Sequence, residues 1–457
     1  MAERYDMLKV DFAGVTLPTP IGVGALAMFM GLSLSADTYA KILLKFAKAG
    51  AGYINIGAIF YAPEDWIRRK RKERGEEFLG VVPAPGEQIP VRRWLKYNGE
   101  EGYFHRAGAM AKEEVKVPWA KYGPPPEAFG RILEGKMPFI KKVMEEKPKD
   151  VPLIANVEAA ADPESYVIVS KKAEELGFDM IELNVSCPFF AILSGNIEAF
   201  LRGEYPLVNM GSIIGDSPEF LEKVVREVVK EVSIPVGVKL TPETGFPRVI
   251  DICRRIRDAG AKFVVSANMG ITIPPPNIYN RGQSTLPFTK GNPFIAYGGE
   301  PLRAIVRKHI AAVSRFVPGL DSLALGGIMT PEHIIEMIML GAKAVGQCAA
   351  IFYRGVNYLR RELDFIVKYM KEQGYSSIEE VRQTGIKNIV TADEAIDLRA
   401  RAEVDPVKCR LCGICADNIC GAISMENGTI KIGNNCMGCG LCVMVCPHGA
   451  LKLVSAT

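Results

Sequence analysis

The chain has 457 residues, a length that suits one large domain and one small one. Hydrophobic residues make up 48% of the chain, charged residues 24%, and the formal net charge is +4. These values are typical of a soluble globular protein. The small net charge argues against a nucleic-acid partner, which a strongly basic composition would favour.

The first long segment without a charged residue runs from 12 to 36, and its length could cross a membrane. However, Pro18, Pro20 and several glycines interrupt it, and acidic residues precede it where a signal peptide would be basic. We therefore expect a buried strand followed by a loop, and no membrane partner. A cytoplasmic location also suits the reduced cysteines near the C-terminus.

Eight short apolar runs recur along the chain, with segments of helical period between them. Several helical segments end in glycine directly before the next run, as in AKAGAGY (47–53), EELGFDM (174–180), RDAGAKF (257–263) and MLGAKAV (339–345). A glycine at this place ends a helix in the left-handed conformation. The runs span 20–24, 52–57, 152–158, 179–185, 235–240, 262–268, 322–327 and 343–348.

These runs lack the alternation of a half-exposed strand, so they indicate a parallel sheet covered by helices. Eight such units predict an α/β fold of the (β/α)8 TIM-barrel type. The alternative is an open doubly wound sheet, for which GVGALA (22–27) is only a weak dinucleotide-binding match.

The domain plan follows from these elements. We predict a barrel over residues 1–375, a helical linker over 376–404 and a small C-terminal α+β domain over 405–457. Residues from about 60 to 126 form an insertion, which is long for a strand–helix connection. Such insertions on a barrel usually shape the substrate pocket or an interface.

Eight of the eleven cysteines lie in two runs near the C-terminus, at 409–420 and 436–447. The second run has the C-x2-C-x2-C-x3-C-P spacing of a [4Fe–4S] site, and the first has one extra residue. In two-cluster ferredoxins the fourth cysteine of each run binds the other cluster. Two zinc sites are the alternative, but they favour C-x2-C pairs. The predicted ligand sets are Cys409, Cys412, Cys415 and Cys446 for one [4Fe–4S] cluster, and Cys436, Cys439, Cys442 and Cys420 for the other.

In a barrel of this type the active site gathers at the C-terminal ends of the strands. The segments ALGGIMTPEH (324–333) and VGQC (345–348) match the usual phosphate site, although their glycines could serve tight turns alone. A phosphate site beside an iron–sulfur domain indicates FMN. Lys239 either faces the N1–C2=O edge of the flavin or extends outward to solvent.

Cys187 directly precedes Pro188, so its backbone is biased towards an extended conformation. A free cysteine is most often a small buried hydrophobic residue, and Cys253 and Cys348 fit that description. Beside Asn184 at the face of a flavin, however, the Cys187 thiol could act as a general acid.

The motifs ELNVSCP (182–188), VKLTP (238–242), SAN (266–268), YGG (297–299), LGGI (325–328) and GQCAA (346–350) carry a family resemblance. With them, nearly the whole chain resembles the flavin half of dihydropyrimidine dehydrogenase, a relative of class 1 dihydroorotate dehydrogenases. The resemblance implies Cys187 as the acid that transfers the proton. It implies Asn184 and Asn268 as substrate ligands, with Ser186 beside them. Around FMN it implies Gly24, Ala25, Lys239, Gly299, Gly326, Gly327 and Cys348.

The chain also departs from the family. A lysine is expected at the end of the second strand, but the sequence there is NIGAI (55–59). Met269 stands where a threonine is expected, His105 aligns loosely with an expected asparagine, and Glu158 is an additional carboxylate. Each lost buried hydrogen bond to a uracil edge would cost about 1–3 kcal/mol. The chemistry is therefore predicted more firmly than the substrate.

The leading hypothesis is an FMN- and iron–sulfur-dependent oxidoreductase that reduces or oxidises a C–C bond conjugated to a carbonyl. Its substrate would be small and cyclic, either pyrimidine-like or another enone or enamide. Because no convincing Rossmann motif occurs, electrons would come from a separate flavin or NAD(P)H subunit or from a ferredoxin, in a homo- or hetero-oligomer.

A second hypothesis is an electron-transfer subunit that binds no small substrate of its own. A third, tRNA dihydrouridine synthesis, is disfavoured by the low net charge and the ferredoxin domain.

Overall fold

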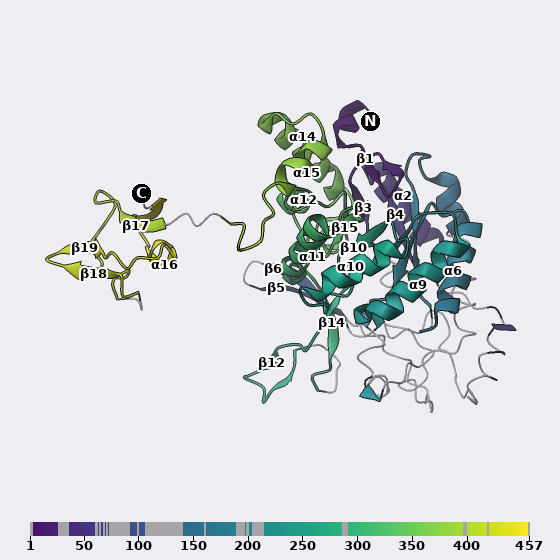
Figure 1. The fold of residues 1–457 in the computed structure, drawn as a ribbon, viewed down its shortest axis with the longest axis horizontal. Helices are drawn as coiled ribbons and strands as arrows, with labels where there is room; N and C mark the ends of the chain where they lie inside the picture. Colours follow the sequence, from purple (N-terminus) through teal and green to yellow (C-terminus); the bar gives the residue numbers. More distant parts are fainter. Residues whose placement is uncertain are drawn as a thin grey trace. The chain divides into compact units, whose positions relative to one another are not determined.

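A computed structural model gives the fold of the chain (Figure 1). It describes residues 3–25, 36–59, 92–97, 100–105, 140–159, 161–188, 214–285, 291–395, 400–417 and 420–455, together with a few isolated positions. The chain divides into two compact units, Met1–Ile389 and Val390–Thr457. The helix α15 (Ile378–Ile386), within the predicted linker, packs against α12 (Pro331–Met339) in the first unit.

The first unit is a closed barrel of eight parallel strands, with neighbours in the order β10-β15-β16-β3-β4-β7-β8-β9. This confirms the predicted TIM barrel, and the doubly wound alternative is wrong. All eight predicted runs form barrel strands. In chain order these are β3 (Ile21–Val23), β4 (Ile54–Ile59), β7 (Leu153–Val157), β8 (Met180–Asn184), β9 (Val236–Lys239), β10 (Phe263–Val265), β15 (Asp321–Leu325) and β16 (Ala344–Gln347).

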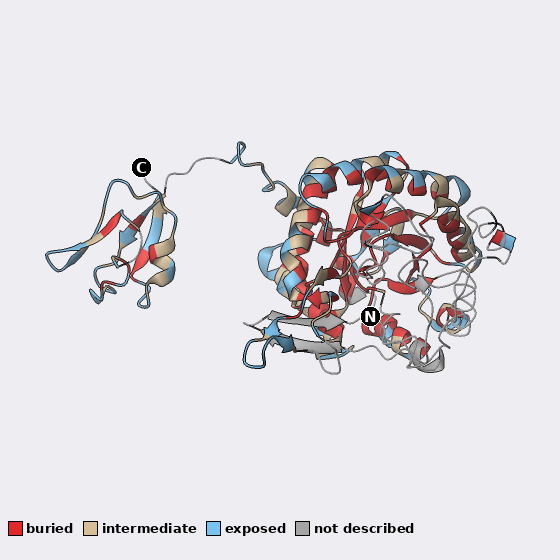
Figure 2. Cartoon of the chain, turned by 90° about the horizontal axis from the view of Figure 1, so that it is seen from below, coloured by how far each residue is buried: buried red, intermediate tan, exposed pale blue. Residues whose placement is uncertain are grey.

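Helices surround these strands, and their buried sides face the barrel (Figure 2). In α9, for example, Leu221, Val224, Val225 and Val228 are buried at helical spacing. The four glycines predicted to end helices, at 50, 177, 260 and 341, all have positive φ. Besides α12, this layer contains α2 (Ala36–Ala49), α6 (Pro163–Glu175), α9 (Pro218–Glu231), α10 (Arg248–Asp258), α11 (Arg303–Phe316), α13 (Ala349–Arg354) and α14 (Tyr358–Gln373).

Short N-terminal elements precede the first barrel strand. A 3-10 helix, η1 (Glu3–Leu8), leads into the hairpin β1 (Val10–Phe12) and β2 (Val15–Leu17). Part of the uncharged segment 12–36 thus forms strands, and its residues 26–35 lie outside the described ones. In the described part of the chain, no helix is long and apolar enough to span a bilayer.

Two strands of the predicted insertion, β5 (Arg92–Tyr97) and β6 (Glu100–His105), join a four-stranded antiparallel sheet of order β11-β14-β6-β5. Its other strands are β11 (Gly270–Thr272) and β14 (Ile295–Gly299). This sheet links the insertion to the segment that follows barrel strand β10. A short hairpin, β12 (Pro276–Asn277) and β13 (Gln283–Ser284), lies between β11 and β14 in the chain. Most of the insertion lies outside the described residues.

The second unit is a small α+β domain, as predicted. Strands β17 (Ala400–Val404) and β20 (Leu451–Ser455) pair antiparallel, and so do β18 (Ile423–Glu426) and β19 (Thr429–Ile432). One short helix, α16 (Leu441–Val445), lies within the second cysteine run. The buried core is small and includes two of the cysteines: Ala402, Cys415, Ile423, Cys442 and Leu451.

Candidate active site

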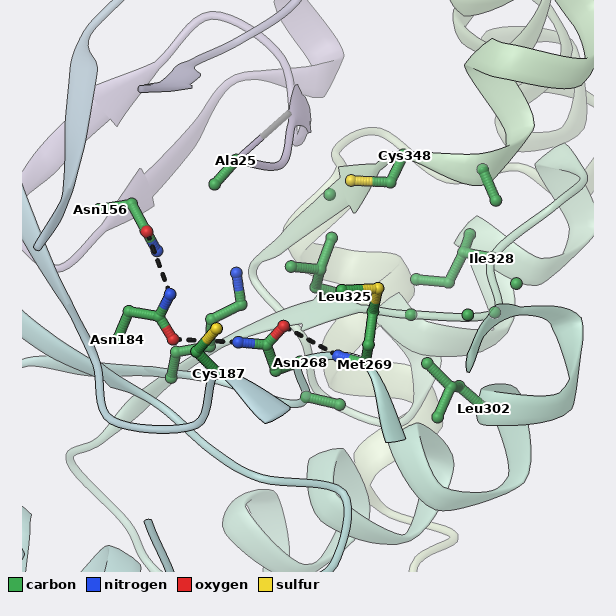
Figure 3. A pocket seen from close by; sticks show the side chains of 18 residues that line it. Ala25, Asn156, Asn184, Cys187, Asn268, Met269, Leu302, Leu325, Ile328 and Cys348 are labelled. Carbon is green, nitrogen blue, oxygen red and sulfur yellow. Dashed lines mark hydrogen bonds between the residues drawn. The ribbon is translucent and has the colours of Figure 1, made fainter. Parts of the chain in front are cut away.

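A cavity of about 780 Å³, partly open to solvent, lies at the C-terminal ends of the barrel strands (Figure 3). It brings together most of the residues implied by the family resemblance, although Ser186 and Gly24 are not among its lining residues. The predicted residues that line it are Ala25, Asn184, Cys187, Lys239, Asn268, Gly299, Gly326, Gly327 and Cys348.

Cys187 reaches the cavity from the loop directly after β8. Its side chain is only 2% exposed, and it packs with Ala296 of β14 and with Met269. The backbone register places His105 of β6 opposite Ala296. By contrast, Cys253 is fully buried within α10, and burial raises the pKa of its thiol to about 12. Of these two buried thiols, only Cys187 lies at the cavity.

Side-chain amides form a continuous hydrogen-bonded chain beside Cys187 (Figure 3). Asn184 donates through Nδ2 to Asn156 Oδ1 at 3.2 Å and to Glu158 Oε1 at 2.8 Å. Asn268 donates through Nδ2 to Asn184 Oδ1 at 3.0 Å and to Ser186 Oγ at 3.2 Å. The N–H groups of both predicted substrate ligands are therefore engaged with neighbouring side chains, so a substrate carbonyl must compete for them.

Two residues that depart from the family pattern shape this region. Glu158, which is 1% exposed, orients the Asn184 amide through the hydrogen bond just described. The backbone N–H of Met269 donates to Asn268 Oδ1 at 2.8 Å, and its side chain lines the cavity. Burial, together with the nearby Glu158 and Cys187, raises the pKa of the Tyr166 hydroxyl well above its usual range.

Lys239 is 4% exposed, and its Nζ lies 3.2 Å from Glu182 Oε1. The alternative that this lysine extends outward to solvent is therefore wrong. Sequence analysis missed Glu182, although the motif ELNVSCP contains it. All five residues of β8 are buried, so a carboxylate within this apolar run is a signal for a buried charged group, although not for its partner.

Glycines form the other end of the cavity. Gly299, Gly326 and Gly327 have φ of 90°, 109° and 77°, values that favour glycine. A Cβ on Gly327 would lie 2.4 Å from the backbone nitrogen of Arg303 at the start of α11. Only glycine fits this close approach, and a glycine loop at the cavity is what an anion site requires.

The thiol of Cys348 is partly exposed to the cavity, and desolvation raises its pKa to about 11. A Cβ on Gly24 would lie 2.9 Å from this Sγ. The backbone cradle, the buried cation Lys239 and the apolar walls together fit FMN. FMN contributes an anionic phosphate, a polar ring edge and an apolar ring face.

In the second unit, the predicted first ligand set surrounds one cavity of about 340 Å³: Cys409, Cys412, Cys415 and Cys446. Burial raises the pKa of Cys415, and the neighbouring thiols of its set add to this effect. The backbone N–H of Ala450 donates to Cys446 Sγ at 3.3 Å. Four thiols around a common space fit a cubane cluster.

In the second set, Cys436 and Cys420 lie close enough to Cys442 to raise the pKa of its thiol, after burial as the main cause. The backbone N–H of Ala402 donates to Cys436 Sγ at 3.3 Å. Within the described ranges, no three His, Cys, Asp or Glu side chains converge closely enough for a single metal ion.

The polar barrel cavity and the cysteine-rich unit define a flavin- and iron–sulfur-dependent oxidoreductase. The dihydroorotate dehydrogenase family model matches residues 205–370, and the 4Fe-4S binding domain model matches 430–452. The dihydrouridine synthase model matches 138–266, within the barrel.

Similar proteins agree with this class. The catalytic subunit of dihydroorotate dehydrogenase B (NAD(+)) from Methanocaldococcus jannaschii is 27% identical over 378 residues, which cover 82% of this chain and 97% of that protein. The NAD-dependent dihydropyrimidine dehydrogenase subunit PreA from Escherichia coli is 28% identical over 335 residues, covering 70% and 76%. The crystal structure of ligand-free DHODH from Eimeria tenella shares the fold, with a TM-score of 0.56, 18% identity and coverage of 84% and 93%. The chain is thus a homologue of the dihydroorotate and dihydropyrimidine dehydrogenase subunits, which confirms the resemblance.

Proposed function

We propose that this chain reduces or oxidises a C–C bond conjugated to a carbonyl in a small cyclic substrate, as dihydropyrimidine dehydrogenase does. One observation carries the proposal: a single cavity is lined by Cys187, Asn184 and Asn268 together with Lys239 and the glycine loop at 326–327. A proton donor, polar substrate ligands and a flavin site are the parts that this reaction needs.

Each group has a role in this mechanism. FMN bound in the cavity would supply or take up a hydride. The Cys187 thiol gives or receives the matching proton, so that hydride and proton together add two hydrogens to the C–C bond or remove them. Because Cys187 is 2% exposed, bulk water has little access to its thiol. Asn184 and Asn268 orient the ring of the substrate, and Ser186 supports the Asn268 amide.

Around FMN we assign Gly24, Ala25, Lys239, Gly299, Gly326, Gly327 and Cys348, and we assign a [4Fe–4S] cluster to each of the two cysteine sets. The clusters would carry single electrons between FMN and a separate redox protein, either a flavin or NAD(P)H subunit or a ferredoxin. None of the eleven cysteines, all of which the structure describes, forms a disulfide, which suits the reducing cytoplasm in which we place the protein. Assembly into a homo- or hetero-oligomer is part of the proposal.

The substrate is either pyrimidine-like or another cyclic enone or enamide. What supports the wider class is that the apolar side chains of Met269, Leu302 and Ile328 line the same cavity as the amides. Such a wall tolerates a ring with fewer polar groups than uracil.

The test is anaerobic. The purified protein is reduced, and uracil, thymine, orotate or buffer is added while flavin and cluster absorbance are followed. We expect reoxidation by a pyrimidine, and we expect Cys187→Ala to slow it strongly while flavin and cluster content stay normal. Cys253→Ala is the matched control, since it removes a buried thiol away from the cavity.

Full turnover in Cys187→Ala would contradict the role of the thiol. A protein with flavin and clusters but no response to any of the three compounds would favour an electron-transfer subunit. Purified protein without a flavin spectrum would refute the proposal as a whole.

A further inference from the structure

Beneath the cavity floor, the barrel interior holds a buried ion pair. Lys239 Nζ lies 3.2 Å from Glu182 Oε1, and the two side chains are 6% and 0% exposed. Among the lining residues that the structure describes, Lys239 is the one with a charged side chain. A group bound in the cavity therefore experiences the field of the Lys239 ammonium together with that of the adjacent Glu182 carboxyl group.

Three donors converge on the Glu182 carboxylate. Asn55 Nδ2 donates to Oε2 at 2.8 Å, and Asn156 Nδ2 and Lys239 Nζ donate to Oε1. An ionised carboxylate only accepts hydrogen bonds, so this arrangement suits the charged form. Lys239 is held in place by the same contact, because a buried ion pair with added hydrogen bonds has one favourable geometry.

A second buried carboxylate lies one strand away. Glu158 is 1% exposed, and its Oε1 accepts from Asn184 Nδ2 at 2.8 Å. Beside the cavity, therefore, one buried ammonium group lies among two buried carboxyl groups. In a low-dielectric interior, negative charge on these carboxyl groups opposes the field of the lysine.

The missing lysine of strand β4 fits this charge arrangement. A Cβ on Gly57 would lie 2.2 Å from the Asn156 Cβ, so any side chain there would displace Asn156. Asn156 in turn donates to Glu182 and accepts from Asn184. The space that a side chain at position 57 would need is occupied by the network that holds the carboxylate.

We propose that Glu182 is a positioning residue that fixes the Lys239 ammonium and makes the bound FMN harder to reduce than Lys239 alone would. The inference rests on the proposed function. Reduction of a flavin by two electrons and one proton adds a negative charge to its ring. A lone ammonium would favour that charge, whereas adjacent carboxylates oppose it. A low flavin potential suits an enzyme that delivers electrons to its substrate.

The test measures the midpoint potential of FMN in the full-length holoprotein, by anaerobic titration with redox dyes at neutral pH. Flavin fluorescence reports the oxidised flavin separately from the clusters. We expect a shift to more positive potential in Glu182→Gln and a value near that of the wild type in Glu182→Asp, which keeps the charge. An unchanged or more negative potential in Glu182→Gln would overturn the inference.

Glu362→Gln is the matched control, because Glu362 is a fully buried carboxyl on α14 outside the cavity lining. Burial raises the pKa of Glu362 to about 8, so this substitution removes little charge at neutral pH. We expect no shift of the FMN midpoint potential in this control.

If Glu182→Gln does not fold or does not retain FMN, Glu158→Gln tests the effect of charge instead. It removes the second carboxyl group beside the cavity and should also raise the FMN potential. An equal shift in the Glu362→Gln control would count against a specific role. Wild-type protein that holds no FMN would refute the proposed function, a result distinct from bound FMN with an unchanged potential.

Discussion

Glu362 allows a quantitative prediction about stability. Its side chain is fully buried, Gln347 Nε2 donates to its Oε1 at 2.9 Å, and its Oε2 has no hydrogen-bond partner among the residues that the structure describes. Burial raises its pKa from the ordinary value of 4.5 to about 8, although Arg354 nearby opposes the shift. In the folded protein at neutral pH, Glu362 is therefore mainly a neutral acid, whereas in the unfolded chain it is ionised.

The sign follows from proton linkage. A carboxyl with a raised folded pKa contributes its full stability below the unfolded pKa and loses it as pH rises through the folded pKa. Between these two values the folded protein binds the extra proton, so stability falls by up to about 1.4 kcal/mol per pH unit. From about pH 6 to about pH 9 the expected loss from this group is about 3 kcal/mol. Glu362→Gln has the shape of the neutral acid and cannot ionise, so it should lack this loss.

The assay is guanidinium unfolding of the first unit, followed by tryptophan fluorescence across that pH range. All three tryptophans lie in this unit. The control is Glu372→Gln on the same helix, where the side chain is 60% exposed and a surface ion pair with Lys368 has little effect on stability. If the wild type and Glu362→Gln lose the same stability between the two pH values, the burial argument is wrong.

Two further predictions concern the cofactor sites. Gly327→Ala should lose FMN from the purified protein, because the new Cβ would meet the Arg303 backbone. Gly177→Ala is the control, since Gly177 also has positive φ but a Cβ there meets nothing within 4 Å. It should lose only about 1 kcal/mol of stability and keep its FMN, which flavin content and unfolding would show. Cys415→Ser and Cys442→Ser should each remove one of the two clusters. Iron content and electron paramagnetic resonance would detect the loss. If either variant loses all of its iron, the two cysteine sets are not separate cluster sites.

The sequence was sufficient to predict the barrel because its signals are local. Each strand is a short apolar run, and glycines at 50, 177, 260 and 341 end the preceding helices with positive φ. A parallel strand buried on both faces needs little more than this pattern to be found. The cysteine spacing likewise predicted which thiols share a cavity, since Cys446 of the second run joins the three of the first.

The polar interior of the barrel was harder to predict. Glu182 and Glu362 each look like an ordinary charged residue in the sequence, yet both side chains are fully buried. Which residues of a barrel strand face inward depends on closure and register, and these are set by partners on other strands. The contact between Lys239 and Glu182 joins residues 57 positions apart. Hydrophobic patterning within either strand does not contain that information.

Met269 offers a test of what the cavity accepts. Its side chain lines the cavity and packs with Cys187 and Ala296, where the resembling family has a threonine. A thioether is a weak hydrogen-bond acceptor and no donor, so a polar edge of uracil placed against it stays unsatisfied. A gain of one hydrogen bond of about 1.4 kcal/mol predicts roughly tenfold tighter uracil binding in Met269→Thr.

The measurement is a titration of the oxidised protein with uracil, followed through the flavin spectrum. Ile328→Thr is the matched control, because it adds a hydroxyl to another part of the same cavity wall. Tighter binding in Met269→Thr alone would assign the selection against pyrimidines to this side chain. Equal tightening in both variants would mean that added polarity anywhere in the cavity is enough. No tightening in either would mean that the engaged amides of Asn184 and Asn268 exclude the pyrimidine. In that case specificity would depend on Glu158, which accepts from Asn184 Nδ2 and so competes with a substrate carbonyl for that donor.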